Sequence, residues 1–207
     1  MLNIALPKGR LGNDVCALFE KNGYVIENFQ KEGRKLVITS EELGANFFLV
    51  KPSDVVVYVE EGVADMGVSG KDTLIESQAD VYELLDLDIG KCRVVVAGPK
   101  NYEDNKGKIL KVATKYTKIT KDYYAKKNRD VEIIKLNGSI ELAPILGLSD
   151  IIVDIVETGS TLKANNLVVL EEIMPISARL IANKSSCKFK SKAIDDVILK
   201  LKGDQRR

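Results

Sequence analysis

A turn rich in hydroxyl groups follows an apolar run late in the chain. The run, residues 151–156, is interrupted only by Asp154 and is typical of a strand buried on both faces of a parallel sheet. Five residues that could bind an anion come next: Glu157, Thr158, Gly159, Ser160 and Thr161. A glycine turn before a helix presents free backbone N–H groups and the positive end of the helix dipole. T-G-S-T alone is also compatible with a polar helix cap, but the strand and acid before it favour phosphate binding, with Asp154 available to sugar hydroxyls.

The composition excludes several other kinds of chemistry. The chain has 207 residues, a net charge of +1, three cysteines and no histidine. Ser-His triads, Cys-His nucleophiles and His-ligated zinc are therefore excluded. Any catalysis or binding must rely on acidic and basic side chains, hydroxyl groups and backbone amides. The balanced charge gives no indication of nucleic acid or an anionic membrane as a partner. The odd, scattered cysteines and the lack of an export signal predict a cytoplasmic protein with reduced thiols.

Short strand-like runs alternate with helical stretches along the whole chain. The strand-like runs lie at residues 2–6, 35–38, 47–50, 66–68, 81–85, 92–97, 111–113, 131–136, 151–156, 168–173 and 179–182. Helical spacing follows Gly9, and a second helix is expected to start at Pro52 with Ser53 or Asp54 as its cap. Further helical stretches lie at residues 118–127, at 140–146 and around 194–201. No repeat or low-complexity tract interrupts this order.

This alternation predicts an α/β protein with mostly parallel sheets. The strands are too many for one small sheet, so we expect two lobes with the active site in the cleft between them. Lobe I is expected to comprise residues 1–90 and 178–207. Lobe II is expected to comprise residues 91–177 and to carry the hydroxyl-rich turn.

The turn resembles the phosphoribosyl-diphosphate signature of phosphoribosyltransferases, in which an apolar strand and acids precede T-G-x-T. The commonest version has two adjacent acids, whereas here Asp154 is followed by Ile155. Four further segments resemble those of ATP phosphoribosyltransferase in the same order: L-P-K-G-R-L at 6–11, V-A-D-M-G-V-S-G-K-D at 63–72, V-A-T-K-Y at 112–116 and N-G-S-I-E-L-A-P at 137–144. The resemblance covers essentially the whole chain and is to the short form of the family.

Membership of that family implies a particular reaction and fold. N1 of ATP would be joined to C1′ of 5-phosphoribosyl-1-diphosphate with release of pyrophosphate, the first step of histidine biosynthesis. The family shares the two-lobed fold of the type II periplasmic binding proteins. It also implies Mg²⁺ held mainly by substrate phosphates, without a carboxylate cage. The expected partner is a regulatory subunit resembling histidyl-tRNA synthetase, in a hetero-oligomer that also self-associates.

The resemblance also implies roles for individual residues. Residues 157–161 would hold the 5-phosphate, with Asp154 and Glu141 near the ribose. Arg10 and Arg34 are the candidates for stabilising the pyrophosphate, because guanidinium groups match phosphate oxygens and stay charged. The remaining candidates for ATP or pyrophosphate are Lys8, Gly9, Lys51, Ser69, Gly70 and Lys71. Without the family match, Arg34 is equally compatible with an exposed turn, and Arg10 with ordinary surface charge.

Two other functions fit parts of the same pattern. A ligand-binding module without chemistry would share the two-lobed fold, since fold does not determine function. A phosphoribosyltransferase acting on a free nucleobase would share the T-G-x-T turn, but the single acid and the Lys8-Gly9-Arg10 opening count against it. The products distinguish them: phosphoribosyl-ATP, a nucleotide from a free base, or bound ligand alone.

Overall fold

The chain divides into two compact units. The computed structural model describes residues 1–23, 36–41 and 44–202. Unit 1 comprises Met1–Gly90 and Ser177–Arg207, and unit 2 comprises Lys91–Ile176. Arg34 lies outside the described residues. No helix among the described residues is long and apolar enough to cross a membrane.

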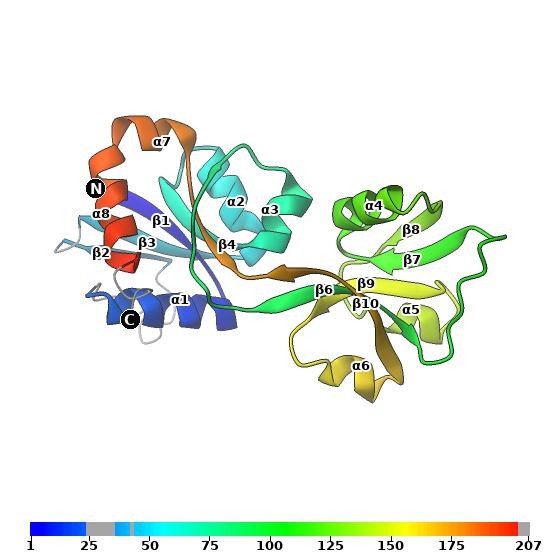
Figure 1. The fold of residues 1–207 in the computed structure, drawn as a ribbon. Coiled ribbons are helices and arrows are strands. Elements are labelled where there is room, and N and C mark those ends of the chain that lie inside the picture. Colours follow the sequence, from blue (N-terminus) through cyan, green and yellow to red (C-terminus); the bar gives the residue numbers. More distant parts are fainter. Residues whose placement is uncertain (24–35, 42–43, 203–207) are drawn as a thin grey trace. The chain divides into compact units, whose positions relative to one another are not determined.

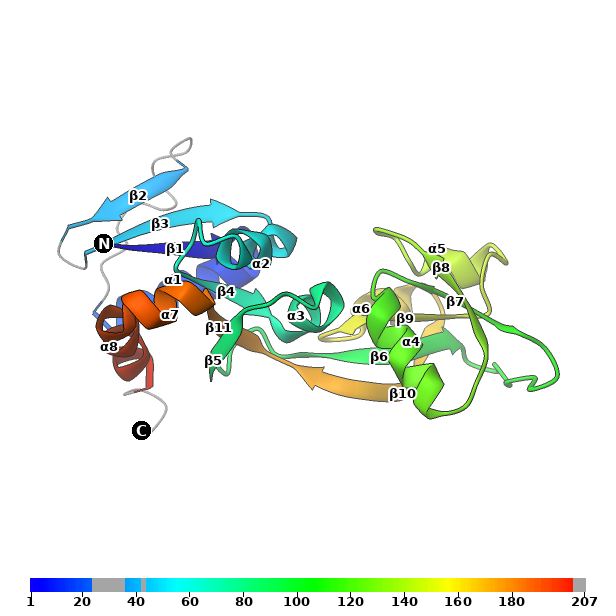
Figure 2. The same cartoon turned by 90° about the horizontal axis from the view of Figure 1, so that it is seen from above.

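Unit 1 is built on a six-stranded sheet with the order β2-β3-β1-β4-β11-β5, which can be followed in Figure 2. The strands are β1 (Leu2–Pro7), β2 (Val37–Ser40), β3 (Ala45–Val50), β4 (Met66–Gly70), β5 (Tyr82–Asp86) and β11 (Ala178–Ala182). β1 runs parallel to both β3 and β4, so these three strands end at the same edge. β2, β11 and β5 join in antiparallel pairs.

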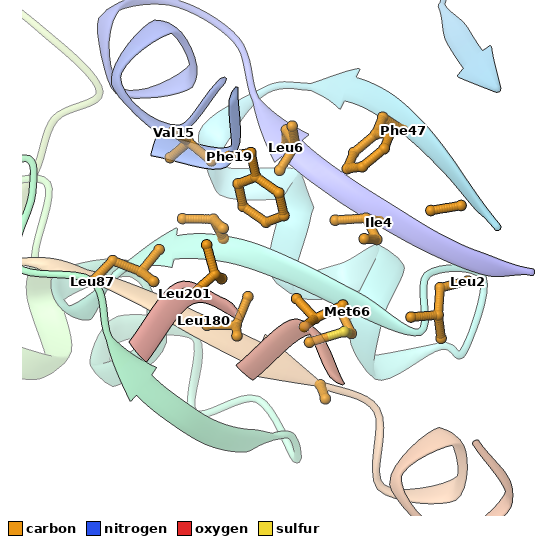
Figure 3. Close-up of a cluster of buried hydrophobic side chains, with 14 of the residues drawn as sticks. Leu2, Ile4, Leu6, Val15, Phe19, Phe47, Met66, Leu87, Leu180 and Leu201 are labelled. Carbon is orange, nitrogen blue, oxygen red and sulfur yellow. The ribbon is translucent and has the colours of Figure 1, made fainter. Parts of the chain in front are cut away.

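Helices cover both faces of the unit 1 sheet (Figure 1). They are α1 (Arg10–Lys21), α2 (Pro52–Glu60), α3 (Lys71–Ser77), α7 (Lys184–Phe189) and α8 (Ser191–Lys202). On one face α1 and α8 enclose a core in which the rings of Phe19 and Phe47 meet edge to face with centroids 5.9 Å apart (Figure 3). On the other face α2 packs Val55, Val56 and Val59 against the sheet. Alternating side chains of β1 supply both cores, as expected for a central strand.

Unit 2 is built on a five-stranded sheet with the order β10-β6-β9-β7-β8. The strands are β6 (Cys92–Pro99), β7 (Leu110–Thr114), β8 (Val131–Lys135), β9 (Ile151–Val156) and β10 (Leu167–Ile176). The helices are α4 (Thr117–Lys126), α5 (Leu142–Ile145) and α6 (Ser160–Ala164). β7 is parallel to β8 and β9, so here too three strands end at one edge. Residues of α5 and α6 pack with Val95, Ala113 and Ile152 on one face of the sheet.

The prediction of mostly parallel sheets is wrong, because both sheets are mixed. Each has a parallel core of three strands, but β6 is antiparallel to β9 and β10, and β11 is antiparallel to β4 and β5. β6 and β11 are the strands next to the points where the chain passes between the units. They enter each sheet without a helical crossover of the kind that parallel neighbours require. Strand direction therefore depended on connections that the local pattern does not reveal.

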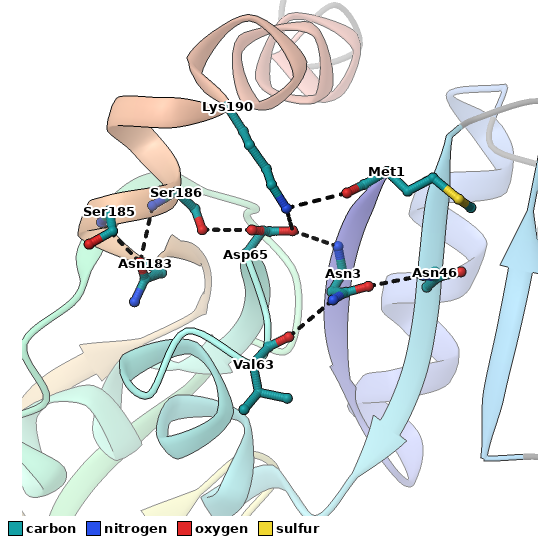
Figure 4. A network of polar contacts seen from close by, with 9 residues as sticks. All are labelled: Met1, Asn3, Asn46, Val63, Asp65, Asn183, Ser185, Ser186 and Lys190. Carbon is teal, nitrogen blue, oxygen red and sulfur yellow. Dashed lines mark hydrogen bonds and ion pairs between the residues drawn. The ribbon is translucent and has the colours of Figure 1, made fainter.

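A buried carboxylate joins several elements at the start of the parallel strands in unit 1 (Figure 4). Asp65 is 4% exposed and accepts hydrogen bonds from Lys190 Nζ at 2.8 Å, Ser186 Oγ at 2.6 Å and the backbone N–H of Asn3 at 2.8 Å. Burial alone would raise the pKa of Asp65, but these bonds and the Lys190 charge bring it below the ordinary value. The network fastens the C-terminal helices to the sheet.

We expect Asp65→Asn to lower the free energy of unfolding by about 2–3 kcal/mol, because a charge-assisted network in a buried site is lost. A carboxyl with a depressed pKa stabilises the fold above the ordinary Asp pKa, and this contribution disappears as the pH falls through the lowered value. The variant should therefore also show a weaker loss of stability in acid. Urea unfolding at several pH values measures both effects.

Asp80→Asn is the matched control, because the Asp80 side chain is 77% exposed and pairs with Lys184 at the surface. Exposed pairs contribute less than about 1 kcal/mol. Equal losses in the two variants would contradict the role given to the Asp65 network.

Candidate functional site

In unit 1 the residues expected to bind ATP or pyrophosphate lie where the parallel strands end. Lys8, Gly9 and Arg10 follow β1, and Lys51 follows β3 directly. The backbone N–H of Lys8 donates to Val50 O at 2.7 Å, which ties these two turns together. Because β1 is parallel to β3 and β4, its turn lies at the same edge as the ends of those strands. The side chains of Lys8, Arg10 and Lys51 are exposed.

The helices that begin at this edge have no side-chain caps. The N-cap residues of α1, α2 and α3 are Gly9, Lys51 and Gly70. In none of these helices does the side chain of the N-cap residue accept a hydrogen bond from a first-turn N–H group. The expected cap of α2 by Ser53 or Asp54 is wrong, because the helix already begins at Pro52 and Ser53 Oγ donates to Asp54 Oδ1 instead. First-turn N–H groups without an intrahelical partner are available to phosphate oxygens.

Ser69 and Lys71 lie at the end of β4, but their side chains differ in character. Ser69 is 1% exposed, and its Oγ has no hydrogen-bond partner among the described residues. A buried hydroxyl without a partner is costly unless a ligand satisfies it, which fits a binding site. Lys71 forms an ion pair with Glu83 on β5. Its positive charge is therefore partly neutralised by the neighbouring carboxylate.

In unit 2 the hydroxyl-rich turn connects β9 to α6. Gly159 has a φ of 79° in the left-handed region, which explains why glycine suits this position. Thr158 Oγ1 lies 3.1 Å from Ser160 Oγ, and Lys163 N donates to Gly159 O at 3.0 Å as the helix begins. The side chains of Glu157, Thr158, Ser160 and Thr161 are exposed. Several hydroxyl groups and backbone donors thus gather in one short solvent-facing turn.

The acidic residues expected near the ribose are close enough to influence each other. The pKa of Asp154 is raised to about 6: burial is the main cause and the charge of Glu141 adds to it, whereas the N–H of Ile155 and the charge of Lys115 lower it. Glu141 is the N-cap of α5, which packs on β9. The structure thus brings Asp154 and Glu141 together at the edge where the turn lies.

Lys115 is the residue at this edge to which sequence reasoning assigned no role. It follows β7 directly and is exposed, although Thr114 and Tyr116 on either side of it are buried. The signal in the sequence was the position of a lysine immediately after a strand, within the V-A-T-K-Y segment. Its relation to Asp154 depends on the pairing of β7 with β9, which the sequence alone does not give.

Comparisons with known proteins agree with this arrangement. A family model described as ATP phosphoribosyltransferase matches residues 51–203. The ATP phosphoribosyltransferase of Brachyspira hyodysenteriae is 59% identical over 199 residues, covering 96% of this chain and 97% of that protein. The corresponding protein of Caldanaerobacter subterraneus is 54% identical over 202 residues, covering 98% of this chain and 96% of that protein.

Solved structures extend the comparison to the fold. A chain of the "ATP phosphoribosyl transferase (HisG:HisZ) complex from Thermotoga maritima" is similar with a TM-score of 0.84 and 37% identity, covering 98% of both chains. The substrate binding protein of an amino acid ABC transporter is similar with a TM-score of 0.61, covering 99% of this chain and 94% of that one. At 17% identity the second similarity shows the fold alone.

The fold and the relatives together define a class, the pentosyltransferases built on the type II periplasmic-binding-protein fold. Within that class the chain belongs to the ATP phosphoribosyltransferase family, whose members catalyse the first step of histidine biosynthesis. The predicted fold resemblance and enzyme class are confirmed. The family match decides against the two alternatives, a binding module without chemistry and a nucleobase phosphoribosyltransferase.

Gly159→Ala tests the conformation of the turn. A Cβ here would meet only Val156 Cγ1 at 3.7 Å, so the cost comes from the left-handed φ and should be about 1 kcal/mol of folding free energy. We also expect weaker binding of phosphoribosyl diphosphate, measured by calorimetry, because the turn must shift to relieve the strain.

Gly147→Ala is the matched control, since Gly147 has a φ of 73° and no atom within 4 Å of an added Cβ. It should lose similar stability and bind the substrate normally. Normal binding by the Gly159 variant would show that the turn does not hold the substrate.

Proposed function

We propose that this ATP phosphoribosyltransferase holds phosphoribosyl diphosphate mainly on unit 2 and the ATP and pyrophosphate groups mainly on unit 1. The observation that carries the proposal is the turn of residues 157–161 at the end of a buried parallel strand. Its N–H groups and hydroxyls suit the 5-phosphate. Asp154 and Glu141 lie next to that turn in a position to accept hydrogen bonds from the ribose hydroxyls.

On unit 1 the proposed contacts are cations and helix N-termini. Arg10, at the first position of α1, binds the pyrophosphate through its guanidinium group, and Arg34 has the same proposed role. Lys8, Gly9 and Lys51 supply charge and backbone donors to the phosphates. Ser69 and Gly70 contact the nucleotide, for which the unpartnered Ser69 hydroxyl is the support. Lys71 contributes there while paired with Glu83.

The chemistry is a substitution at C1′ of the ribose. The C1′–O bond to pyrophosphate breaks, the leaving group takes the electron pair, and N1 of ATP forms the new bond to C1′. Negative charge builds on the pyrophosphate as positive charge builds on the ribose ring. Fixed cations and N–H groups that face the leaving group stabilise this separation, and alignment of N1 with C1′ contributes the rest. No protein acid or base is required, which suits a chain without histidine.

Mg²⁺ is proposed as the metal of the reaction, held mainly by substrate phosphates. Among the described residues, no group of three or more His, Cys, Asp and Glu could hold a metal ion. The proposal leaves most of the coordination to phosphate oxygens and water, because Mg²⁺ keeps several waters and binds through substrate phosphates in nucleotide sites. When bound, the metal would neutralise charge on the pyrophosphate.

The proposed assembly includes a second kind of subunit. The similar Thermotoga maritima chain was solved as a HisG:HisZ complex. We propose that this chain likewise joins a regulatory subunit resembling histidyl-tRNA synthetase in a hetero-oligomer and also self-associates.

The proposed location of the enzyme is the cytoplasm, where ATP is available. Residues 1–90 with 178–207 and residues 91–177 are proposed to act as the two lobes of the enzyme.

The first test is formation of phosphoribosyl-ATP from ATP and phosphoribosyl diphosphate with Mg²⁺, with and without the partner. We expect Thr161→Ala to lower kcat/KM by about tenfold, the effect of one lost hydrogen bond to a charged group. Arg10→Ala should lower it by about 100-fold, as expected when a donor to developing charge is removed.

Thr39→Ala is the matched control for the threonine variant, because Thr39 is exposed on β2 and bonds only to Asn46 Oδ1 in the described structure. It should retain full activity. Wild-type activity in the Arg10 and Thr161 variants would remove these two residues from the site.

Removal of divalent cations should abolish the reaction. We expect EDTA to reduce phosphoribosyl-ATP formation to background and added Mg²⁺ to restore it, because the charge on the leaving pyrophosphate is no longer neutralised. Sodium chloride at matched ionic strength serves as the control. Full turnover in EDTA would contradict the proposed metal requirement.

A further inference from the structure

Lys115 directly follows β7, and Asp154 lies in the neighbouring strand β9 of the unit 2 sheet. β7 and β9 are parallel neighbours, and their register pairs Thr114, the last residue of β7, with Val153, the residue before Asp154. Lys115 is therefore the first residue after the paired part of β7, next to the part of β9 that contains Asp154. Successive side chains of a strand alternate between the two faces of its sheet. Asp154 lies two residues after Ile152 on β9, so its side chain is on the face of the core that contains Ala113 and Ile152.

The backbone at Lys115 is fixed by a buried threonine. Thr114 is 0% exposed, and its Oγ1 donates to Val153 O at 2.6 Å and accepts from Tyr116 N at 2.8 Å. Tyr116 O in turn accepts from Thr120 Oγ1 at 2.7 Å, at the start of α4. The position of Lys115 beside β9 is therefore set by hydrogen bonds on both sides of it. Its ammonium lies 5.6 Å from the centre of the Tyr116 ring.

Among the described residues, Lys115 and Glu141 are the charged groups that affect the ionisation of Asp154. Lys115 lies on the β7 side, and Glu141 approaches from the start of α5. On the β6 side the partner in register is the uncharged Val95, and Arg93, two residues away, is paired with Glu172. Burial and Glu141 both raise the pKa of Asp154, and Lys115 is the cation that lowers it.

We propose that Lys115 is a positioning residue of the transferase, whose ammonium keeps the Asp154 side chain as a carboxylate that can accept hydrogen bonds from the ribose of phosphoribosyl diphosphate. The proposal rests on the proposed contact between Asp154 and the ribose. A protonated Asp154 would donate one of its hydrogen bonds and lose acceptor capacity. Lys115 thus acts through Asp154 and without contact to the reacting atoms.

The direct test is the titration of Asp154 in the folded, substrate-free protein, followed by the carbon-13 resonance of its carboxyl group and assigned with Asp154→Asn. In the wild type the midpoint should lie near the pKa of about 6. Lys115→Met should move the midpoint up by about one unit, the effect of losing a neighbouring opposite charge. Lys115→Arg should restore the wild-type midpoint. An unchanged or lower midpoint in Lys115→Met overturns the proposal.

The second test is the pH profile of phosphoribosyl-ATP formation. An ionised Asp154 is gained as the pH rises, so Lys115→Met should lose about threefold in kcat/KM at pH 6.5 and recover nearly fully at pH 8.5. In an Asp154→Asn background the same change should add nothing. A loss of equal size at both pH values overturns the proposal, because it means that Lys115 acts on the substrate or the fold directly.

Lys135→Met is the matched control for both tests. Lys135 ends the neighbouring strand β8 and pairs in register with Thr114, one residue before Lys115. Its side chain is exposed, on the face opposite to Ile134 and Leu136, which pack against the core shared with Asp154. It should alter neither the titration nor the profile. If the wild type forms no phosphoribosyl-ATP, the proposed function fails, while the titration still decides the role of Lys115.

Discussion

The hydrogen bonds between parallel strands are the constraint on which the candidate site depends. They hold β1 beside β3 and β4 in unit 1, and β7 beside β8 and β9 in unit 2. Parallel neighbours must end at the same edge, and the chain then turns into a helix or loop. Residues far apart in the sequence, such as Lys8, Lys51 and Ser69, are brought to one edge in this way. Loops alone could not align so many donors without a rigid frame.

The two edges of the unit 1 sheet differ in how well their polar groups are satisfied. At the start of the parallel strands, Asp65 has three donors, and Asn183 caps α7 by accepting from the N–H groups of Ser185 and Ser186. At the opposite edge, within the part of the chain that the structure describes, three helices lack side-chain caps and Ser69 Oγ lacks a partner. Unsatisfied groups reduce stability, and they collect where a ligand can satisfy them. The satisfied edge offsets part of that cost.

In unit 2 the corresponding edge combines a turn that requires a left-handed φ with a carboxylate whose pKa is raised. Gly159 supplies the left-handed φ, so the turn needs no compensation elsewhere. Asp154 is held in a partly buried position beside Glu141, which makes its charge depend on its surroundings. A group whose ionisation is finely balanced is typical of functional sites. The proposed role of Lys115 adds the end of the neighbouring strand β7 to the candidate site. β7 contains no residue of the phosphoribosyl-diphosphate signature at 151–161.

The sequence by itself determined the features that depend on short stretches of chain. The hydroxyl-rich turn after β9, the helix after Gly9 and the α/β alternation follow from local periodicity and turn chemistry. The ordered segments were enough to identify the family. The sequence pattern did not reveal α3 or α7, which are short and lack a long apolar period.

Only the tertiary structure decided the features that depend on strand pairing. The antiparallel entry of β6 and β11, the pairing of Lys71 with Glu83 and the placement of Lys115 beside Asp154 all join residues from different strands or helices. The physical reason is that the register between distant segments is set by the packing of whole elements, whereas a turn or a helix is set by the residues within it.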